Sequence, residues 1–156
     1  KVEFEKPSAE PWRIGSATVR RIALNHPGSA QGFRIDDASG ASVAYLTDNE
    51  LVRGAAGKAA LDDLARFAAN TGLLIHDSQY LDSDMPDKYG WGHSVIDDVV
   101  TLGARAEARG VVLFHHDPNR TDDDLDAIKV RAAALLAEQA PEAELCVAIE
   151  GQSIEL

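Results

Sequence analysis

The chain has 156 residues, 45% of them hydrophobic, which is typical of one soluble globular domain with a substantial core. Fifteen Lys and Arg residues against 26 Asp and Glu residues give a formal net charge of -11, which opposes binding to a long polyanion such as RNA or DNA. The single cysteine, Cys146, excludes an internal disulfide. Because no stretch has the length of a membrane span and the N-terminus lacks the pattern of a signal peptide, we expect a cytoplasmic protein that does not enter the membrane.

The first residues are expected to form a linker and the rest a single domain. Two prolines disfavour regular structure in residues 1–12, so we expect the domain to span residues 13–156. Its first strand is predicted over residues 17–24, where β-branched residues alternate loosely with others. The turn sequence that follows carries His26, which is therefore expected at the corner between a strand and a loop.

A hairpin is predicted next. Residues 32–35 and 42–46 are rich in strand formers, and the sequence between them favours a turn. The second of these strands runs out into polar residues that include Asp48. Asp48 is therefore a second polar side chain placed directly after a strand.

The remainder of the chain alternates helices with strands. Apolar residues at helical spacing predict helices over residues 59–69, 94–109 and 121–139, after a flexible glycine-containing stretch at 54–57. Short apolar runs predict strands over residues 73–75, 111–114 and 145–149. Two of the helices begin with the spacing of a capping box, Ser94 with Asp97 and Thr121 with Asp124. Hairpin strands followed by this alternation predict an α/β fold with a mixed sheet and flanking helices.

A long polar loop is predicted between residues 78 and 92. Its length and its aromatic residues favour a lid or a binding loop over a simple connector. His93 follows it at the predicted start of a helix, where the helix dipole and the free amide groups favour an anion.

All five histidines, together with several aspartates, lie next to the ends of predicted strands or the start of a helix. They are His26, Asp48, His76, Asp77, His93, His115, His116 and Asp117. Ligands in open α/β sheets bind beyond the carboxyl ends of the strands. Imidazole and carboxylate groups are ligands of zinc and similar divalent ions, and one carboxylate can bridge two metals. The pattern therefore predicts a metal site at one edge of the sheet.

Each of these side chains also has a purely structural interpretation. His26 and Asp48 are common turn residues, and His76 lies within an apolar run and is expected to point into the core. Asp77 is consistent with a loop cap, and His93 with a residue that merely precedes a helix. The joint arrangement favours a site, because chance rarely places every histidine of a chain at the same edge of a sheet.

Six stretches taken in order resemble the second half of the metallo-β-lactamase-fold hydrolases. They are Asn25-His26-Pro27-Gly28, Gly32-Phe33-Arg34-Ile35, Ala44-Tyr45-Leu46-Thr47-Asp48-Asn49-Glu50, Ile75-His76-Asp77-Ser78-Gln79-Tyr80, Gly90-Trp91-Gly92-His93-Ser94 and Leu113-Phe114-His115-His116-Asp117-Pro118. The branch that they resemble contains ribonuclease Z and the cyclic-phosphodiester phosphodiesterases. The resemblance implies the second αβ half of an αββα sandwich.

The resemblance also implies roles for individual residues. His26, Asp48 and His115 match metal ligands, with Asp48 as the carboxylate that bridges two ions. His93 matches a proton donor to the leaving oxygen, and Asp77 matches the acidic residue that orients it, an arrangement that favours a protonated imidazole. The implied cofactor is a pair of divalent ions, with zinc as the default and manganese or iron also suited to mixed histidine and carboxylate ligands. His116 matches no assigned role.

The family's first-half signature, His-x-His-x-Asp-His, is absent from this sequence. Three matching ligands cannot complete a site for two metals, so we expect the missing half to lie in the same protein, with this chain as a fragment. A partner chain that supplies the half and a degenerate, inactive chain are the alternatives. The expected substrate is a small phosphodiester such as a cyclic nucleotide rather than a nucleic acid.

Two other interpretations of the sequence differ in class. The chain is also consistent with a non-catalytic half-domain that serves as an assembly module, whose exposed apolar sheet face drives homo-oligomer formation. A flavodoxin-like or receiver-type regulatory domain would explain acidic residues at strand ends. It would leave the histidines unexplained.

Overall fold

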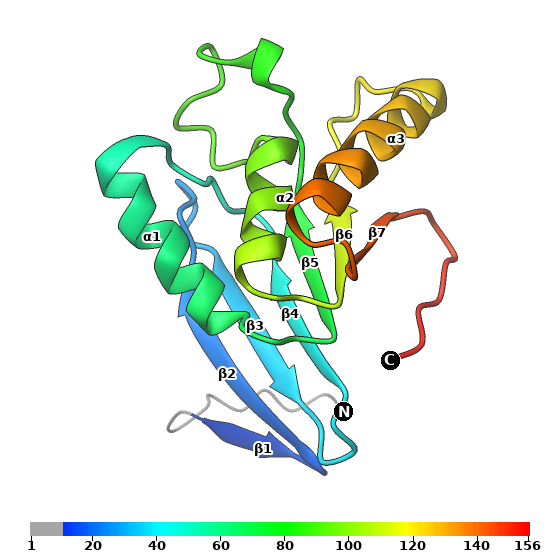
Figure 1. The fold of residues 1–156 in the computed structure, drawn as a ribbon. Coiled ribbons are helices and arrows are strands. Elements are labelled where there is room, and N and C mark those ends of the chain that lie inside the picture. Colours follow the sequence, from blue (N-terminus) through cyan, green and yellow to red (C-terminus); the bar gives the residue numbers. More distant parts are fainter. Residues whose placement is uncertain (1–10) are drawn as a thin grey trace, which may run out of the picture.

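The computed structural model describes residues 11–156, which form one seven-stranded sheet with helices packed on it (Figure 1). The strands are β1 (Trp12–Ile14), β2 (Ala17–Ala23), β3 (Gln31–Asp36), β4 (Ser42–Leu46), β5 (Leu73–Asp77), β6 (Gly110–Phe114) and β7 (Glu144–Val147). The helices are α1 (Gly54–Phe67), α2 (Ile96–Arg105) and α3 (Asp122–Gln139), with a short 3-10 turn at Asp82–Asp84.

The strands lie in the sheet in the same order as in the sequence, from β1 to β7. Neighbouring strands from β1 through β4 pair in the antiparallel sense. Neighbouring strands from β4 through β7 pair in the parallel sense. Because β2 and β4 are both antiparallel to β3, the carboxyl end of β2 reaches the same edge as those of the parallel strands. We call this edge the carboxyl edge. The predicted hairpin and the mixed α/β sheet are confirmed.

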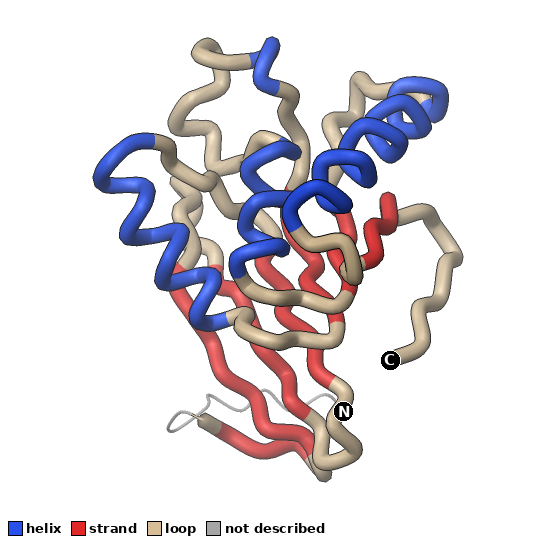
Figure 2. Tube along the Cα trace, in the orientation of Figure 1, coloured by secondary structure: helices blue, strands red, loops and turns tan. Residues whose placement is uncertain are grey.

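All three helices lie on one face of the sheet (Figures 1 and 2). The core forms between these helices and the sheet. Its largest fully buried aliphatic side chains are Leu46, Leu74, Val99, Val100, Leu102, Val111, Leu113 and Leu136. These side chains come from β4, β5, β6, α2 and α3, so apolar burial fixes how the helices sit on the parallel part of the sheet.

No helix of the described residues covers the opposite face of the sheet (Figures 1 and 2). The register aligns Phe33 with Tyr45 and Tyr45 with Ile75 across neighbouring strands, and paired residues point to the same side. The Tyr45 and Phe114 rings lie 6.1 Å apart, and Tyr45 is 38% exposed. We call this surface, made of Phe33, Ile35, Tyr45, Ile75 and Phe114, the uncovered face.

Helix α1 begins at Gly54, earlier than the predicted start at residue 59. The stretch predicted to be flexible instead forms the first turn of the helix. Gly57 permits this, because a Cβ at that position would lie 1.5 Å from the Val52 carbonyl oxygen. Close backbone packing, which the helical spacing of apolar residues does not reveal, sets the start of this helix.

The capping box predicted at Ser94 and Asp97 is wrong. Helix α2 begins at Ile96, and its N-cap residue Val95 makes no side-chain cap hydrogen bond. The Ser94 hydroxyl instead donates to the Asn49 carbonyl and accepts from the Leu51 amide. Tertiary contacts have taken the group that local spacing assigned to the helix.

The second predicted capping box is confirmed. The Thr121 hydroxyl accepts from the Asp124 amide, and the Asp124 carboxylate accepts from the Thr121 amide. The two serine and threonine patterns looked alike in sequence. Thr121 caps its helix because it lies at an exposed helix start, where no buried loop competes for the hydroxyl.

Most of the predicted linker, residues 1–10, lies outside the described residues. Trp12, the last residue of that linker, is the first residue of β1, and its ring makes an edge contact with Phe33 at 6.4 Å. Among residues 11–156, no helix combines the length and the apolar composition needed to cross a lipid bilayer.

Candidate metal centre

The carboxyl edge brings the five predicted site residues together. They are His26 after β2, Asp48 after β4, Asp77 at the end of β5, His93 before α2 and His115 after β6. One possible ligand atom from each of Asp48, Asp77, His93 and His115 lies within 4.8 Å of the others. The His26 ring lies 5.4 Å from the His93 ring. Neighbouring imidazole and carboxylate groups of this kind are a donor set suited to divalent zinc, manganese or iron.

Asp48 and His115 form the exposed part of this group. The His115 Nε2 lies 3.4 Å from a carboxylate oxygen of Asp48, and the two side chains are 38% and 42% exposed, respectively. Both residues have positive φ angles, 59° for Asp48 and 57° for His115. Such angles are uncommon for residues with a Cβ, persist only where the surroundings impose them, and are concentrated at functional sites.

His93 and Asp77 form the deeper part. The Asp77 carboxylate is fully buried and is hydrogen-bonded to the His93 Nδ1. Its other oxygen accepts from the Ser94 amide at 3.1 Å. Since Nδ1 is held by the carboxylate, Nε2 is the nitrogen that His93 can offer to a ligand or a proton. The His93 ring also stacks on the His115 ring at 5.0 Å, which fixes its plane.

His26 is placed next to the group, but its ring is engaged differently. Its Nδ1 accepts a hydrogen bond from the Gly28 amide at 3.0 Å, so the proton of the neutral ring sits on Nε2. Metal binding through Nε2 therefore requires this turn bond to be given up. The structure thus fits a metal directly at Asp48 and His115, and at His26 after a change of tautomer.

Asn49 connects the loops that carry these residues. It is 1% exposed, and its side-chain oxygen accepts from the Asn25 amide at 2.9 Å. Its side-chain nitrogen therefore faces the His76 Nε2, at 3.2 Å, and its carbonyl accepts from the Ser94 hydroxyl. Each of these partners is the direct neighbour in sequence of a predicted site residue.

The bonds of Asn49 thus tie together the loops of His26, Asp77 and His93, while Asn49 itself follows Asp48. We conclude that Asn49 positions four of the five side chains without contributing a ligand. The sequence-based prediction missed it. The sequence did offer one signal, a run of four polar residues, 47–50, directly after a buried strand. In the structure, Thr47, Asn49 and Glu50 of this run are buried, and only Asp48 is partly exposed.

His76 occupies the core, as its apolar surroundings predicted. It is fully buried, and because its Nε2 accepts from the Asn49 amide, its Nδ1 carries the proton and donates to the Asp77 carbonyl at 2.6 Å. Burial lowers the pKa of the imidazole below its usual value of 6.5. His76 is therefore a neutral histidine that supports the strand end beneath Asp77.

The side chains of His116 and Asp117 have local roles. The His116 Nε2 lies 3.3 Å from the Ala148 carbonyl, and Asp117 accepts from the Asn119 amide within a turn. Burial lowers the pKa of His116. Neither belongs to the group of possible metal ligands found in the described residues.

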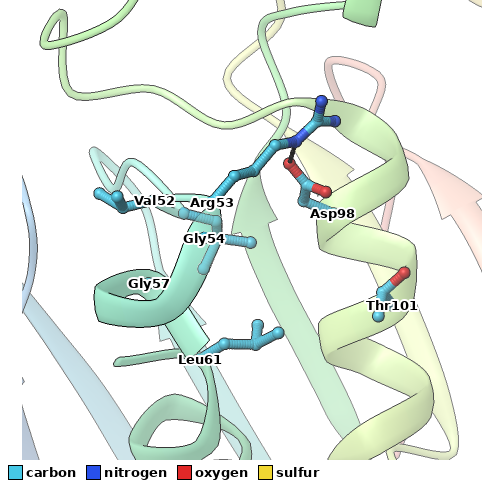
Figure 3. Close-up of a pocket in the computed structure, with 8 residues that line it drawn as sticks. Val52, Arg53, Gly54, Gly57, Leu61, Asp98 and Thr101 are labelled. Atoms are coloured by element: carbon cyan, nitrogen blue, oxygen red, sulfur yellow. Dashed lines mark hydrogen bonds and ion pairs between the residues drawn. The ribbon is translucent and has the colours of Figure 1, made fainter. Parts of the chain in front are cut away.

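A pocket opens beside the site, between the start of α1 and α2 (Figure 3). Its lining includes Leu51, Leu61 and Thr101, and Arg53 spans its rim to pair with Asp98. None of the five predicted site residues belongs to this lining. The candidate metal centre lies at the sheet edge and is separate from this pocket.

The chain is similar in sequence to archaeal ribonuclease Z proteins. It is 31% identical to ribonuclease Z of Pyrococcus furiosus over 107 residues, which are 68% of this chain and 28% of that protein. It is 26% identical to ribonuclease Z of Thermoplasma acidophilum over 128 residues, which are 78% of this chain and 39% of that protein. The chain thus spans well under half the length of these relatives. No family model matches it.

Solved structures share the fold. The metallo-β-lactamase fold protein YhfI from Bacillus subtilis superposes with a TM-score of 0.72 at 20% identity, covering 92% of this chain and 51% of that one. A diphosphatase of the PhnP family superposes with a TM-score of 0.62 at 18% identity, covering 100% of this chain and 50% of that one. The expected α/β metallo-β-lactamase fold, a mixed sheet with flanking helices, is confirmed.

Proposed function

We propose that this chain is part of a dinuclear metal-dependent phosphodiesterase. It has a metallo-β-lactamase fold. The carboxyl edge of its sheet brings together His26, Asp48, Asp77, His93 and His115. The observation that carries the proposal is the cluster at the exposed edge, in which imidazole and carboxylate atoms lie within 4.8 Å of one another. Such a group is costly to assemble without a function, because two of its members hold positive φ angles.

Asp48, His115 and His26 would hold the metal ions. Bound divalent ions would supply Lewis-acid stabilisation of the negative charge that develops on a phosphate. The side chains of Asp48 and His115 are open to solvent, so a substrate can approach them from the edge of the sheet.

His93 would donate a proton to the departing oxygen. The Nδ1–H of His93 donates to the buried carboxylate of Asp77, so Nε2 is the nitrogen that would carry the proton to be transferred. A general acid must be held within hydrogen-bond reach of the departing oxygen, and the bond to Asp77 fixes the position of the His93 ring. Asp77 itself is held by the Ser94 amide and acts through His93.

Three ligands cannot fill two metal sites, since zinc alone takes four ligands in most proteins. The remaining ligands would come from another αβ half, in the same protein or in a partner chain. The uncovered face supports this, because strand alternation places Asp77 on the same side as Ile75, so a layer packed there would meet the site. The coverage of the relatives also fits a half.

A small phosphodiester, such as a cyclic nucleotide, is the substrate that the charge of this chain favours. A net charge of -11 repels a long polyanion more than a compact one. The curated relatives are called ribonuclease Z, so precursor RNA is the alternative substrate. Assaying both substrate classes with the same preparation separates the two.

The role of His93 gives the test of this function. In the complete protein, His93→Ala is expected to lower the turnover of a 2′,3′-cyclic nucleotide by roughly 10²–10⁴-fold, as for loss of a general acid. Asp63→Asn, at an exposed position on α1, is the matched control and should change turnover by less than about twofold. Turnover by His93→Ala within about threefold of the parent protein would refute the assignment.

A non-catalytic assembly module is the second candidate, and the uncovered face favours it. Exposed contiguous apolar surface drives association. Light scattering on the isolated chain should then show a stable oligomer whose formation is independent of zinc. A monomer in the same measurement removes this candidate.

A further inference from the structure

The loop from Ser78 to His93 presents aromatic side chains beside the candidate metal centre. Trp91 is 56% exposed and Tyr89 is 52% exposed. The ammonium of Lys88 lies over the Trp91 ring, 4.1 Å from its centroid. An ammonium in this position is attracted to the indole face, so Lys88 holds the Trp91 ring in one orientation.

The loop is anchored at several points. The two carboxylate oxygens of the mostly buried Glu50 accept from the Gly90 and Gly92 amides, each at 3.0 Å. At the other end of the loop, Asp82 pairs with Arg53, which also binds Asp98 (Figure 3). A further ion pair joins Asp84 to Arg120. These contacts support the binding-loop alternative of the prediction, and we call this anchored loop the wall of the site.

This wall touches the site directly. Gly92 packs against His26 so closely that a Cβ there would lie 2.2 Å from the imidazole, and its φ of 91° also requires glycine. Trp91 is therefore next in sequence to a residue in contact with His26, and two residues from His93. The Lys88 ammonium lies 5.7 Å from the Tyr80 ring, which lies 6.0 Å from the His93 ring.

We propose that Trp91 is a specificity-determining residue that stacks on the nucleobase of a nucleotide substrate whose phosphate lies at the metal centre. This inference rests on the proposed phosphodiesterase function and assigns its substrate class. A nucleobase lies one sugar away from its phosphate, so it falls on the surface next to the site, where Trp91 is exposed. A flat ring matches the indole, and because Lys88 restrains the Trp91 ring, less side-chain freedom is lost on stacking.

Besides its contact with the Trp91 ring, Lys88 brings a positive charge to this part of the surface. Carboxylates surround this region, and burial together with the charges of Asp117, Asp77, Glu50 and Asp84 raises the pKa of Tyr80. In that negative field a phosphate is repelled. The Lys88 ammonium lies near both the Tyr80 and the Trp91 ring, so its positive charge offsets part of this repulsion.

The test measures how much the base adds to binding. The zinc-loaded chain is titrated with thymidine 5′-monophosphate and with ribose 5-phosphate, which lacks a base. Trp12→Phe removes the other tryptophan, so fluorescence then reports Trp91 alone. We expect the nucleotide to quench this fluorescence and to bind roughly 5- to 150-fold more tightly than ribose 5-phosphate.

Variants in the same loop separate stacking from folding. Trp91→Leu should bring the affinity ratio of the two ligands, measured by calorimetry, to about 1, while Trp91→Phe should retain part of the preference. Tyr89→Leu changes an equally exposed aromatic residue of the loop and should keep the full ratio. A ratio near 1 in the unmodified chain, a preference that survives Trp91→Leu, or no detectable nucleotide binding would overturn the proposal.

Turnover decides the underlying function separately. A protein that prefers the nucleotide through Trp91 but hydrolyses no phosphodiester keeps the stacking role and loses the phosphodiesterase role. A protein that hydrolyses methyl 4-nitrophenyl phosphate but shows no preference for a ligand with a base keeps the phosphodiesterase role and loses the stacking role.

Discussion

The two faces of the sheet are built from the same strands but differ in what covers them. On one face, Leu74 and Leu113 are fully buried beneath three helices. On the other, the large side chains of Tyr45 and Ile35 remain 38% and 39% exposed. The covered face supplies the buried core of this chain. The uncovered face keeps partly exposed apolar side chains, which the proposed second αβ half would cover.

The largest effect that separates the two faces is the loss of a buried leucine. Leu113→Ala on the covered face should reduce the free energy of unfolding by about 2–5 kcal/mol, because it removes apolar burial and leaves a cavity. Tyr45→Thr is the matched change on the uncovered face and should cost less than about 1 kcal/mol, since threonine keeps the strand preference. Urea unfolding of the isolated chain measures both. Equal losses would mean that the uncovered face is already packed in solution.

The next effect concerns the polar network at the edge where the two faces meet. Asn49→Ala leaves the Asn25 amide and the His76 Nε2 without their partner, at a cost of about 1–3 kcal/mol for each buried group. It should also lower zinc affinity by roughly 10–100-fold, because residues behind metal ligands hold their geometry. Calorimetric zinc titration tests this, with Asn119→Ala, in an exposed turn, as the control. Unchanged zinc affinity would show that Asn49 serves stability alone.

A smaller effect is the pH dependence that His76 gives to the covered face. The folded state lowers the pKa of His76 below 6.5, so between the two pKa values only the unfolded chain binds the proton. Stability is therefore complete above about pH 6.5 and falls with acidification, by up to about 1.4 kcal/mol per pH unit.

Urea unfolding at pH 7.5 and 5.5, with a chelator present, measures this loss for the parent chain and for His76→Gln. The variant should lose less stability between the two pH values than the parent chain does. An identical loss in both proteins would mean that other groups carry the acid sensitivity.

The sequence predicted the parallel strands and the position of the site because both depend on local patterns. Short apolar runs that end in polar residues, such as Leu73-Leu74-Ile75 before His76, identify buried strands and the edge at which they finish. The same pattern placed His115 after β6 and Asp48 after β4. These side chains then converge because parallel strands share a carboxyl edge.

What the sequence missed depends on contacts between distant segments. Strand β1 is short and mostly exposed, so Trp12 to Ile14 carry little periodic signal. Ser94 resembled a helix cap, and only the meeting of two loops turned its hydroxyl toward Asn49. Asn49 itself has no distinguishing local pattern, because its role arises from partners that are 24, 27 and 45 residues away.

Zinc titration of the isolated chain by calorimetry tests the central claim most directly. We predict detectable binding whose affinity falls at least tenfold in His115→Ala and in Asp48→Asn, and remains unchanged in Asp63→Asn. We also predict that dialysis removes the metal, because the ligand set of this chain is incomplete. Zinc binding that is unaffected by both site variants, or no binding at any zinc concentration tested, would contradict the assignment of this edge as half of a metal centre.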